Sequence, residues 1–238
     1  MLLLMVQVSC SPQHLEAFNL WYNSHLPNLL RIPGYLWAQR YLELPNLGPD
    51  QENRFTALYG VRAAEDLANL LEWNGPGLHP IAAAEFANWE MLQGLSKRVG
   101  NVYEQISGSP LGEPLLLSDR PVSIVTADVD PRQEEEWDRW YTESHVPNLL
   151  KIPGYALAGR FRVFEHPALS GFNTGPKYLA LYECESEDVL PTLGPGEAMH
   201  PEAAAELQRW QERGLPHVSN FAWGFHKLIS KHFKWPDA

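Results

Sequence analysis

Two histidines in closely similar sequence surroundings are the first candidates for chemistry. His25 follows Trp-Tyr-Asn-Ser and precedes Leu-Pro, and His145 follows Trp-Tyr-Thr-Glu-Ser and precedes Val-Pro. Imidazole changes charge near neutral pH, so it suits a general acid or base. We predict that each histidine ends a helix at the break caused by the next proline, with its ring free to turn toward a cavity. The alternative is a structural histidine that binds carbonyls released by that proline.

Aromatic side chains one helical turn earlier extend this candidate site. Tyr22 and Tyr141 could each supply a phenol donor, and Trp21 and Trp140 could form an aromatic wall. Ordinary core packing is the alternative for aromatic residues on a helix. The predicted catalytic residues are His25, His145, Tyr22 and Tyr141.

Strand residues and a second pair of histidines are predicted to bind a substrate. A mid-strand arginine could hold a carboxylate or phenolate, or it could pair with a surface acid. His79 and His200 precede Pro-x-Ala-Ala-Ala-Glu and are expected to mark the start of a helix. The predicted substrate-binding residues are Trp21, Trp140, Arg40, Arg160, His79, His200, Tyr103, Trp223 and His226.

Differences between the two halves favour the second half as the working one. Tyr103 aligns with His226, and Trp223 has no obvious counterpart. His226 would add a titratable group opposite His145, and mutual repulsion would lower the pKa of one of them. A strand register that turns His226 away would remove this argument.

The candidates recur because much of the sequence occurs twice. The segment from Ser24 to Tyr35 returns from Ser144 to Tyr155, and His79 to Glu85 returns as His200 to Glu206. The second copy carries one extra residue, Glu143, before its Ser-His pair. We predict two modules, 1–107 and 120–230, with a linker at 108–119 rich in Ser, Gly and Pro and a tail at 231–238.

Each module has the pattern β-α-β-β-α-β. The expected strands are 2–8, 35–44, 55–61 and about 100–106 in the first module, and 122–129, 155–164, 178–183 and 218–229 in the second. This order is the ferredoxin-like arrangement, which leaves one sheet face uncovered by helices. We therefore predict an α+β fold in which two ferredoxin-like modules of one chain form a pseudo-dimeric α/β barrel.

Composition excludes several classes of partner. The chain of 238 residues has a net charge of −11 and no run rich in Lys or Arg, so we expect neither nucleic-acid nor membrane binding. The apolar stretch at 2–8 is too short to cross a bilayer and lacks the features of a signal peptide. Cys10 and Cys184 are expected to be free thiols in a reducing cytoplasm, and no metal site is predicted.

The motif Trp-Tyr-x-x-Ser-His-x-Pro, followed by a Pro-Gly turn and a strand that carries an arginine, resembles the dimeric α/β-barrel superfamily. Its branch similar to the ethyl tert-butyl ether degradation protein (EthD) fits best. That family is normally a homodimer of single modules, and this chain resembles a fused version. The resemblance implies a cavity between sheet and helices in each half. Relatives use such cavities for cofactor-free cyclisation, decarboxylation, isomerisation, dehydration or oxygenation of small molecules, and more distant relatives bind haem.

We therefore expect an enzyme without cofactors, a lyase, isomerase or cyclase, acting on a small hydrophobic substrate of aromatic or polyketide type. One histidine would move a proton while a tyrosine positions an oxygen. A non-catalytic small-molecule binder and a monooxygenase, with or without haem, are the alternatives. The chain would be a monomer with an internal pseudo-dimer, or a homodimer of it.

Overall fold

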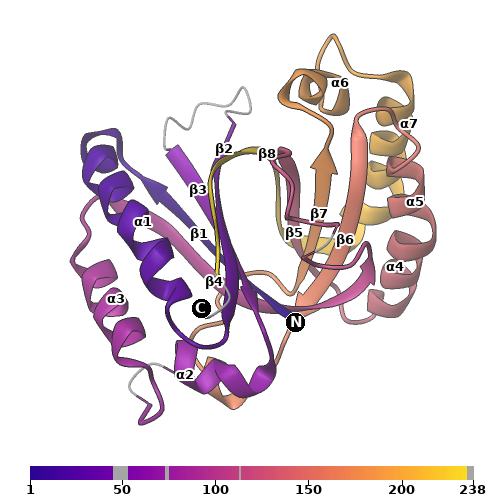
Figure 1. Cartoon of the computed structure of the whole chain (residues 1–238). Coiled ribbons are helices and arrows are strands. Elements are labelled where there is room, and N and C mark those ends of the chain that lie inside the picture. The colour runs from indigo at the N-terminus through magenta and orange to yellow at the C-terminus, as the bar shows by residue number, and fades with distance from the viewer. Residues whose placement is uncertain (45–52, 73–74, 113, 235–238) are drawn as a thin grey trace. The chain divides into compact units, whose positions relative to one another are not determined.

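The computed structural model describes residues 1–44, 53–72, 75–112 and 114–234, and Figure 1 shows its ribbon. Its elements follow the order β-α-β-β-α-β twice, which confirms the predicted α+β fold of two ferredoxin-like modules. The strands of each module pair antiparallel with one another in a sheet. The origin of the two modules by tandem duplication stays a prediction.

The first compact unit contains the described residues of Met1–Glu104, Val163–Gly175 and Leu228–Ala238. Strand β1 (Leu2–Cys10) pairs antiparallel with β3 (Asn53–Val61) on one side and β4 (Leu95–Gly108) on the other, and β2 (Tyr35–Glu43) pairs with β3. The helices α1 (Leu15–Leu30) and α3 (Pro80–Met91) pack side by side on this sheet, and α2 (Leu67–Leu71) is short.

The second compact unit contains Gln105–Arg162 and Pro176–Lys227. Strand β5 (Val122–Val129) pairs antiparallel with β7 (Tyr178–Cys184) and β8 (Val218–Phe233), and β6 (Tyr155–Val163) pairs with β7. Its helices are α4 (Glu134–Trp140), α5 (Val146–Leu149), α6 (Leu190–Leu193) and α7 (Pro201–Arg209). The segment Val163–Gly175, from the second sequence repeat, thus belongs to the first unit. The predicted module boundaries stay a prediction for the repeats.

The helix break or kink expected before the repeated proline is absent at Pro27, and before Pro147 the helix continues through a π-helical turn. Helix α1 continues through Pro27 to Leu30, so His25 does not lie at a helix C-terminus. In the second unit Val146, before Pro147, has φ −59° and ψ −49°, which is helical. Residues Tyr141–His145 form a π-helical turn there. Such a turn holds one more residue than an α turn, which accounts for the inserted Glu143.

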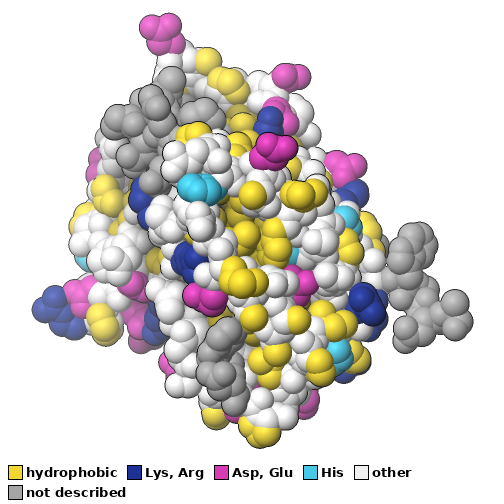
Figure 2. Space-filling model, turned by 90° about the vertical axis from the view of Figure 1, so that its left-hand side faces the viewer, with side chains coloured by type: hydrophobic (Ala, Val, Ile, Leu, Met, Phe, Trp, Pro, Cys, Tyr) yellow, Lys and Arg dark blue, Asp and Glu magenta, His cyan; other side chains and the backbone are white. Residues whose placement is uncertain are grey.

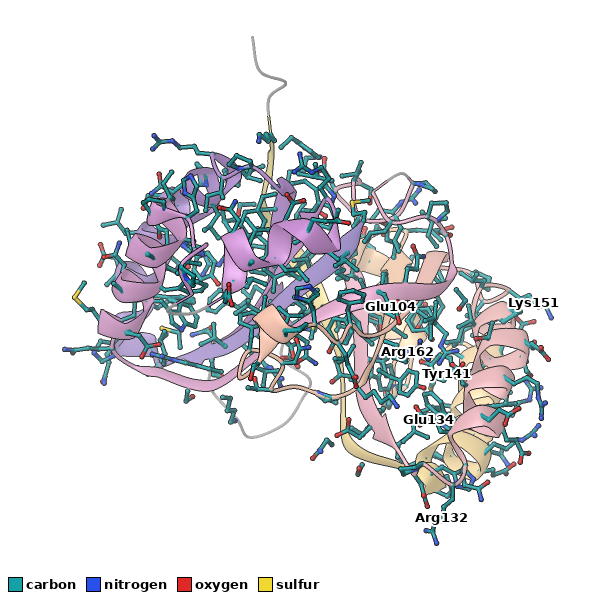
Figure 3. The ribbon with its side chains drawn as sticks, turned by 90° about the horizontal axis from the view of Figure 1, so that it is seen from below. Glu104, Arg132, Glu134, Tyr141, Lys151 and Arg162 are labelled. Atoms are coloured by element: carbon teal, nitrogen blue, oxygen red, sulfur yellow. The ribbon has the colours of Figure 1, made fainter. Side chains whose placement is uncertain are left out.

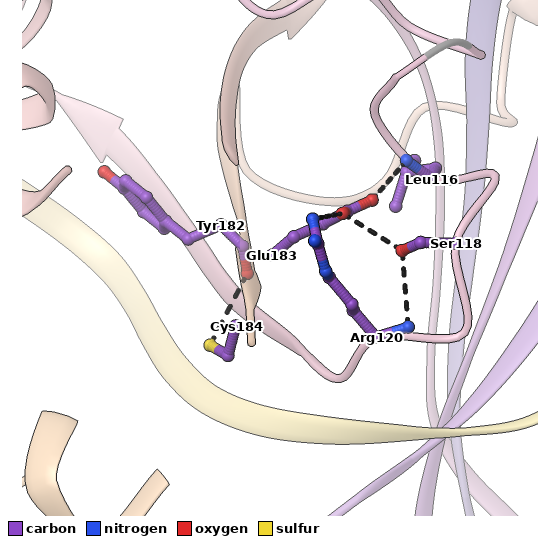
Figure 4. Close-up of polar contacts among 6 residues, drawn as sticks. All are labelled: Leu116, Ser118, Arg120, Tyr182, Glu183 and Cys184. Atoms are coloured by element: carbon purple, nitrogen blue, oxygen red, sulfur yellow. Dashed lines mark hydrogen bonds and ion pairs between the residues drawn. The ribbon is translucent and has the colours of Figure 1, made fainter. Parts of the chain in front are cut away.

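The predicted linker is held firmly by a buried carboxylate. Glu183 accepts hydrogen bonds from the Leu116 amide at 2.6 Å and the Ser118 hydroxyl at 3.0 Å, and Arg120 Nη1 lies 3.5 Å away (Figure 4). Leu116 has a positive φ of 67°, which aims its amide at this carboxylate. Leu116, Ser118 and Arg120 are therefore anchored to β7 of the second unit.

Within the described ranges, no helix combines the length and apolar character needed to cross a membrane. Both cysteines, Cys10 and Cys184, are free and buried.

Candidate functional site

A cavity of about 460 Å³ lies in the first unit, between its two long helices and its sheet. Figure 2 views the face that carries these helices and shows hydrophobic side chains gathered near its centre, with charged side chains beside them. The volume is within the usual range for small-molecule sites. The residues that line it from α1 and α3 are Tyr22, His25, Leu29, Ala82, Glu85, Phe86, Trp89 and Glu90, and those from the strands include Leu4, Val6, Tyr35, Tyr59, Arg98 and Gly100.

A segment of the second repeat completes this cavity. Ser170, Gly171, Phe172 and Thr174 line it, and they belong to Val163–Gly175 of the first unit. The segment is tied to β4, because the Asn173 Oδ1 accepts from the Val102 amide at 2.9 Å and the Gly175 amide donates to Asn101 Oδ1 at 2.8 Å. The first repeat without this segment would therefore have an incomplete wall.

His25 forms a pair with a buried glutamate. Its Nδ1 lies 2.7 Å from Glu85 Oε2, and Asn28 donates to Glu85 Oε1 at 2.7 Å. Burial lowers the pKa of His25 and outweighs the opposing effect of Glu85. Burial raises the pKa of Glu85. The hydrogen bonds from His25 and Asn28 lower this pKa by a larger amount, so the net shift is downward. We infer a neutral imidazole that donates from Nδ1 to the carboxylate and keeps Nε2 as a proton acceptor.

Aromatic rings fix the orientation of this imidazole. Trp21 stacks on His25 with ring centroids 4.0 Å apart, and Tyr22 meets it edge-on at 5.4 Å. Trp21 is not among the lining residues, so it supports the histidine from outside the cavity. The imidazole is thus held on both sides, as a positioned base requires.

Three tyrosines form the polar floor of the cavity. Tyr59 donates to Tyr22, and the rings of Tyr35 and Tyr59 lie 5.7 Å apart. Burial raises the pKa of Tyr22 to about 12, with Arg40 acting in the opposite direction. These phenols therefore remain protonated at neutral pH and can serve as hydrogen-bond donors.

The two mid-strand arginines support the tyrosines and do not line the larger cavities. Arg40 is buried with its guanidinium 4.1 Å from the ring centre of Tyr22, and it donates to Asn19 Oδ1 at 2.7 Å. Arg160 lies 4.3 Å from the ring centre of Tyr141 and pairs with Asp138 at 2.7 Å. Each stabilises its aromatic neighbour through a cation–π contact.

The second unit repeats the pair in a much smaller space. His145 Nδ1 lies 2.7 Å from Glu206 Oε1, and Tyr182 donates to Tyr141 at 2.8 Å. Tyr141 lies on the sheet-facing side of its helix, whereas Lys151 points outward (Figure 3). The cavity beside these residues measures only about 60 Å³, room for a few water molecules at most. Trp140 stacks on His145 at 5.2 Å from outside this cavity.

The last strands explain the difference in volume. Val6 faces Gly100 across β1 and β4, and Val125 faces Trp223 across β5 and β8. Gly100 is therefore the counterpart of Trp223 that sequence comparison missed. Trp223 lines the smaller cavity and donates from Nε1 to Ser123 at 2.9 Å, so a large ring occupies the space that glycine leaves open in the first unit.

The remaining predicted residues lie elsewhere. His79 and His200 accept a backbone amide through Nδ1, at 3.2 Å each, and cap the N-termini of α3 and α7. Tyr103 and His226 are equivalent by register, since Leu3 faces Tyr103 and Val122 faces His226. Both are buried, and neither lines the cavity of its own unit. His226 therefore does not face His145, and the argument for the second cavity fails on strand register.

Sequence reasoning missed the two glutamates and four tyrosines. Glu85 and Glu206 occur at the same place in both repeats, after three alanines on a helix face that packs inward. A repeated carboxylate among small apolar residues needs a buried partner, and this signal pointed to the histidines. Nothing in the sequence except their place in predicted strands distinguishes the four tyrosines, which are Tyr35, Tyr59, Tyr155 and Tyr182.

Cofactor ligands are few in the part of the chain that the structure describes. No group of three or more His, Cys, Asp or Glu there is placed to hold a metal ion. His25 is the cavity residue that could offer a ring nitrogen, Nε2, to a haem iron, because Glu85 already holds its Nδ1.

Together, the fold and the site define an α/β-barrel protein with an apolar cavity and a His–Glu pair in its wall. No curated protein matches this chain. A family model described as "Domain of unknown function (DUF4286)" matches residues 122–220, which is less than half of the sequence.

Solved structures share the fold at low sequence identity. An anthrone oxidase-like protein has a TM-score of 0.65 at 11% identity, covering 98% of this chain and 93% of its own. A candidate monooxygenase from Fusobacterium nucleatum subsp. nucleatum has a TM-score of 0.61 at 8% identity, with 98% and 94% coverage. A candidate chlorite dismutase has 0.52 at 12%, with 97% and 96% coverage. The chain thus has the dimeric α/β-barrel fold along nearly its whole length.

Proposed function

We propose that this protein is an enzyme, a lyase, isomerase or cyclase, that removes a proton from a small aromatic or polyketide-like substrate without a cofactor. The observation that carries the proposal is the His25–Glu85 pair in the wall of a largely apolar cavity of about 460 Å³. An EthD-like ancestry with tandem duplication accounts for the repeated motif. The working site is in the first unit, because the second cavity is too small for such a substrate.

The chemistry follows from the tautomer of His25. Its Nε2 takes a proton from a carbon next to a substrate carbonyl, and the imidazolium that forms is stabilised by the Glu85 carboxylate 2.7 Å away. The phenol of Tyr22, which itself accepts the hydroxyl proton of Tyr59, donates a hydrogen bond to the oxygen that becomes negative. The apolar walls exclude water, which strengthens these interactions.

A monooxygenase is the second candidate, and the names of the structural neighbours favour it. The same deprotonation would activate a substrate toward oxygen, so the two candidates share the first step. They differ in whether oxygen is consumed. A haem version would in addition show a strong absorption band in the visible spectrum of the purified protein.

Deuterium exchange tests the proposal before the natural substrate is known. The protein is incubated in D₂O with a flat bicyclic ketone such as 2-tetralone, and loss of the proton signal next to the carbonyl is followed by NMR with and without oxygen. We expect exchange at least about 10²-fold above that of heat-denatured protein, as general-base catalysis typically provides. If the protein binds a panel of such ketones without catalysing exchange, the enzymatic proposal is contradicted and the protein is a non-catalytic small-molecule binder.

A further inference from the structure

The two halves differ at two positions of one strand, and both positions line the cavities. Register makes Gly100 equivalent to Trp223. Two residues earlier, Arg98 and Phe221 occupy the same place in the β-bulge of their strands. A left-handed residue occurs at the same step in both strands, Lys97 with φ 49° and Asn220 with φ 48°, which fixes the correspondence. Arg98 and Gly100 line the large cavity, and Phe221 and Trp223 line the small one.

Gly100 shapes the cavity by lacking a side chain. A Cβ at this position would lie 3.0 Å from the Phe172 ring, which is closer than ordinary packing allows. The glycine therefore lets Phe172 lie close against β4. The rings of Phe172, Phe86 and Trp89 form aromatic walls of the cavity. Such walls favour a flat ring system.

Arg98 supplies a fixed positive charge at the cavity. It is the only Lys or Arg among the described residues that line it. Its guanidinium lies 5.1 Å from the ring centre of Trp89 and 3.3 Å from Glu90 Oε1. The Glu90 side chain is 62% exposed, so it can return to water at small cost when another anion binds. In the second repeat the pair is absent, because Phe221 and Gln211 occupy these places.

We propose that the substrate is a flat aromatic molecule that carries a carboxylate, which pairs with Arg98 while the ring body lies between Gly100 and His25. The proposal names the substrate class of the site and rests on the proposed function for the identity of that site. Carboxylate recognition by a guanidinium is bidentate and charge-assisted, which gives it selectivity over a neutral group of the same shape.

Titration with two naphthalene probes tests this assignment. The probes are 2-naphthoate, which is anionic at neutral pH, and 2-naphthalenemethanol, which is neutral and of similar shape. We expect the native protein to bind the carboxylate at least about tenfold more tightly. Arg98→Met should weaken carboxylate binding about tenfold or more and leave alcohol binding unchanged. Arg31→Met, which removes an exposed arginine of the same unit, is the matched control.

Steric variants test the role of the glycine separately. Gly100→Trp should abolish binding of both probes. Since that variant can fail to fold, Trp223→Gly provides the converse, and it should raise the alcohol stoichiometry from one to two. Equal affinity for both probes in the native protein, or equal losses in Arg98→Met, would overturn the carboxylate assignment. If binding depends on Arg98 but the protein shows no deuterium exchange, the proposed enzymatic function is contradicted, while carboxylate recognition by Arg98 is supported.

Discussion

Glu85 determines both the orientation of the His25 ring and part of its pKa shift. The carboxylate holds Nδ1 at 2.7 Å and is itself held by Asn28. Its hydrogen bond and its charge both raise the pKa of His25, against the stronger lowering by burial. The basicity of the histidine therefore depends directly on this one side chain, which acts as a positioning residue.

Replacing that carboxylate by an amide should change the pH dependence of the reaction. In Glu85→Gln the pKa of His25 falls further below its ordinary value, so the acid limb of the exchange-rate profile moves to lower pH. The plateau rate should fall about 10–100-fold, because a weaker base is also less well oriented. A profile measured by NMR between about pH 4 and 8 checks both effects. An acid limb that stays in place with the rate merely reduced would indicate a purely structural role.

His145 also pairs with a glutamate, Glu206, and under the proposed function its role is structural. It is buried against Glu206, which also accepts from Arg209 at 2.6 Å. His145→Gln should lower the free energy of unfolding by about 1–3 kcal/mol, since a buried carboxylate loses a charge-assisted partner. Urea unfolding measures this change. A variant as stable as the native protein would show that the pair contributes little to folding.

At the scale of elements, the sequence predicted all eight strands and mispredicted the first helix of each repeat. Alternating apolar residues and turn signals located the eight strands, although β4, β8 and β1 extend beyond the expected ends. The proline rule failed at Pro27 and Pro147, because packing of the helix against the sheet keeps it intact and a π turn absorbs the inserted Glu143. The site was predicted only in part, because partners such as Glu85 come from a distant helix.

The linker offers a test of how elements are joined. Glu183→Ala would leave the amide of Leu116 and the hydroxyl of Ser118 without their buried acceptor. We expect a loss of about 1–3 kcal/mol in unfolding free energy and faster proteolysis within residues 109–120. Glu185→Ala, at an exposed position two residues on, is the control. Equal protease resistance in the two variants would contradict an anchoring role for Glu183.

At the scale of the whole molecule, buried phenols should make the protein sensitive to alkali. Burial raises the pKa of Tyr22 to about 12 and those of Tyr59 and Tyr182 well above the ordinary value. Raised values mean that the stabilisation is complete below pH 10 and is lost as the pH rises through the folded-state values. Tyr22 alone would cost roughly 2 kcal/mol by pH 12. Melting temperatures recorded from pH 8 to 12 should fall steeply above pH 10, and a flat curve there would contradict the buried network.

The asymmetry of the two halves is the main property of the molecule that sequence alone misjudged. Trp223 suggested a larger aromatic site in the second unit, whereas in the structure its ring lines a cavity of only about 60 Å³. His226 lies on the other face of its strand. The volume of a cavity depends on which face of a strand each side chain occupies. A shift of the strand register by one residue moves every side chain to the opposite face. Under the proposed function, the repeated motif identifies the residue types of the site but not which of the two copies works.

The comparison of His25→Gln with His145→Gln tests the central claim most directly. Both variants remove the same imidazole from the same His–Glu arrangement, one in the cavity of about 460 Å³ and one in the cavity of about 60 Å³. Exchange rates are measured under identical conditions on protein that circular dichroism shows to be folded. We predict a loss of at least about 10²-fold for His25→Gln and an unchanged rate for His145→Gln. A large loss in His145→Gln with His25→Gln unaffected would contradict the assignment of the working site.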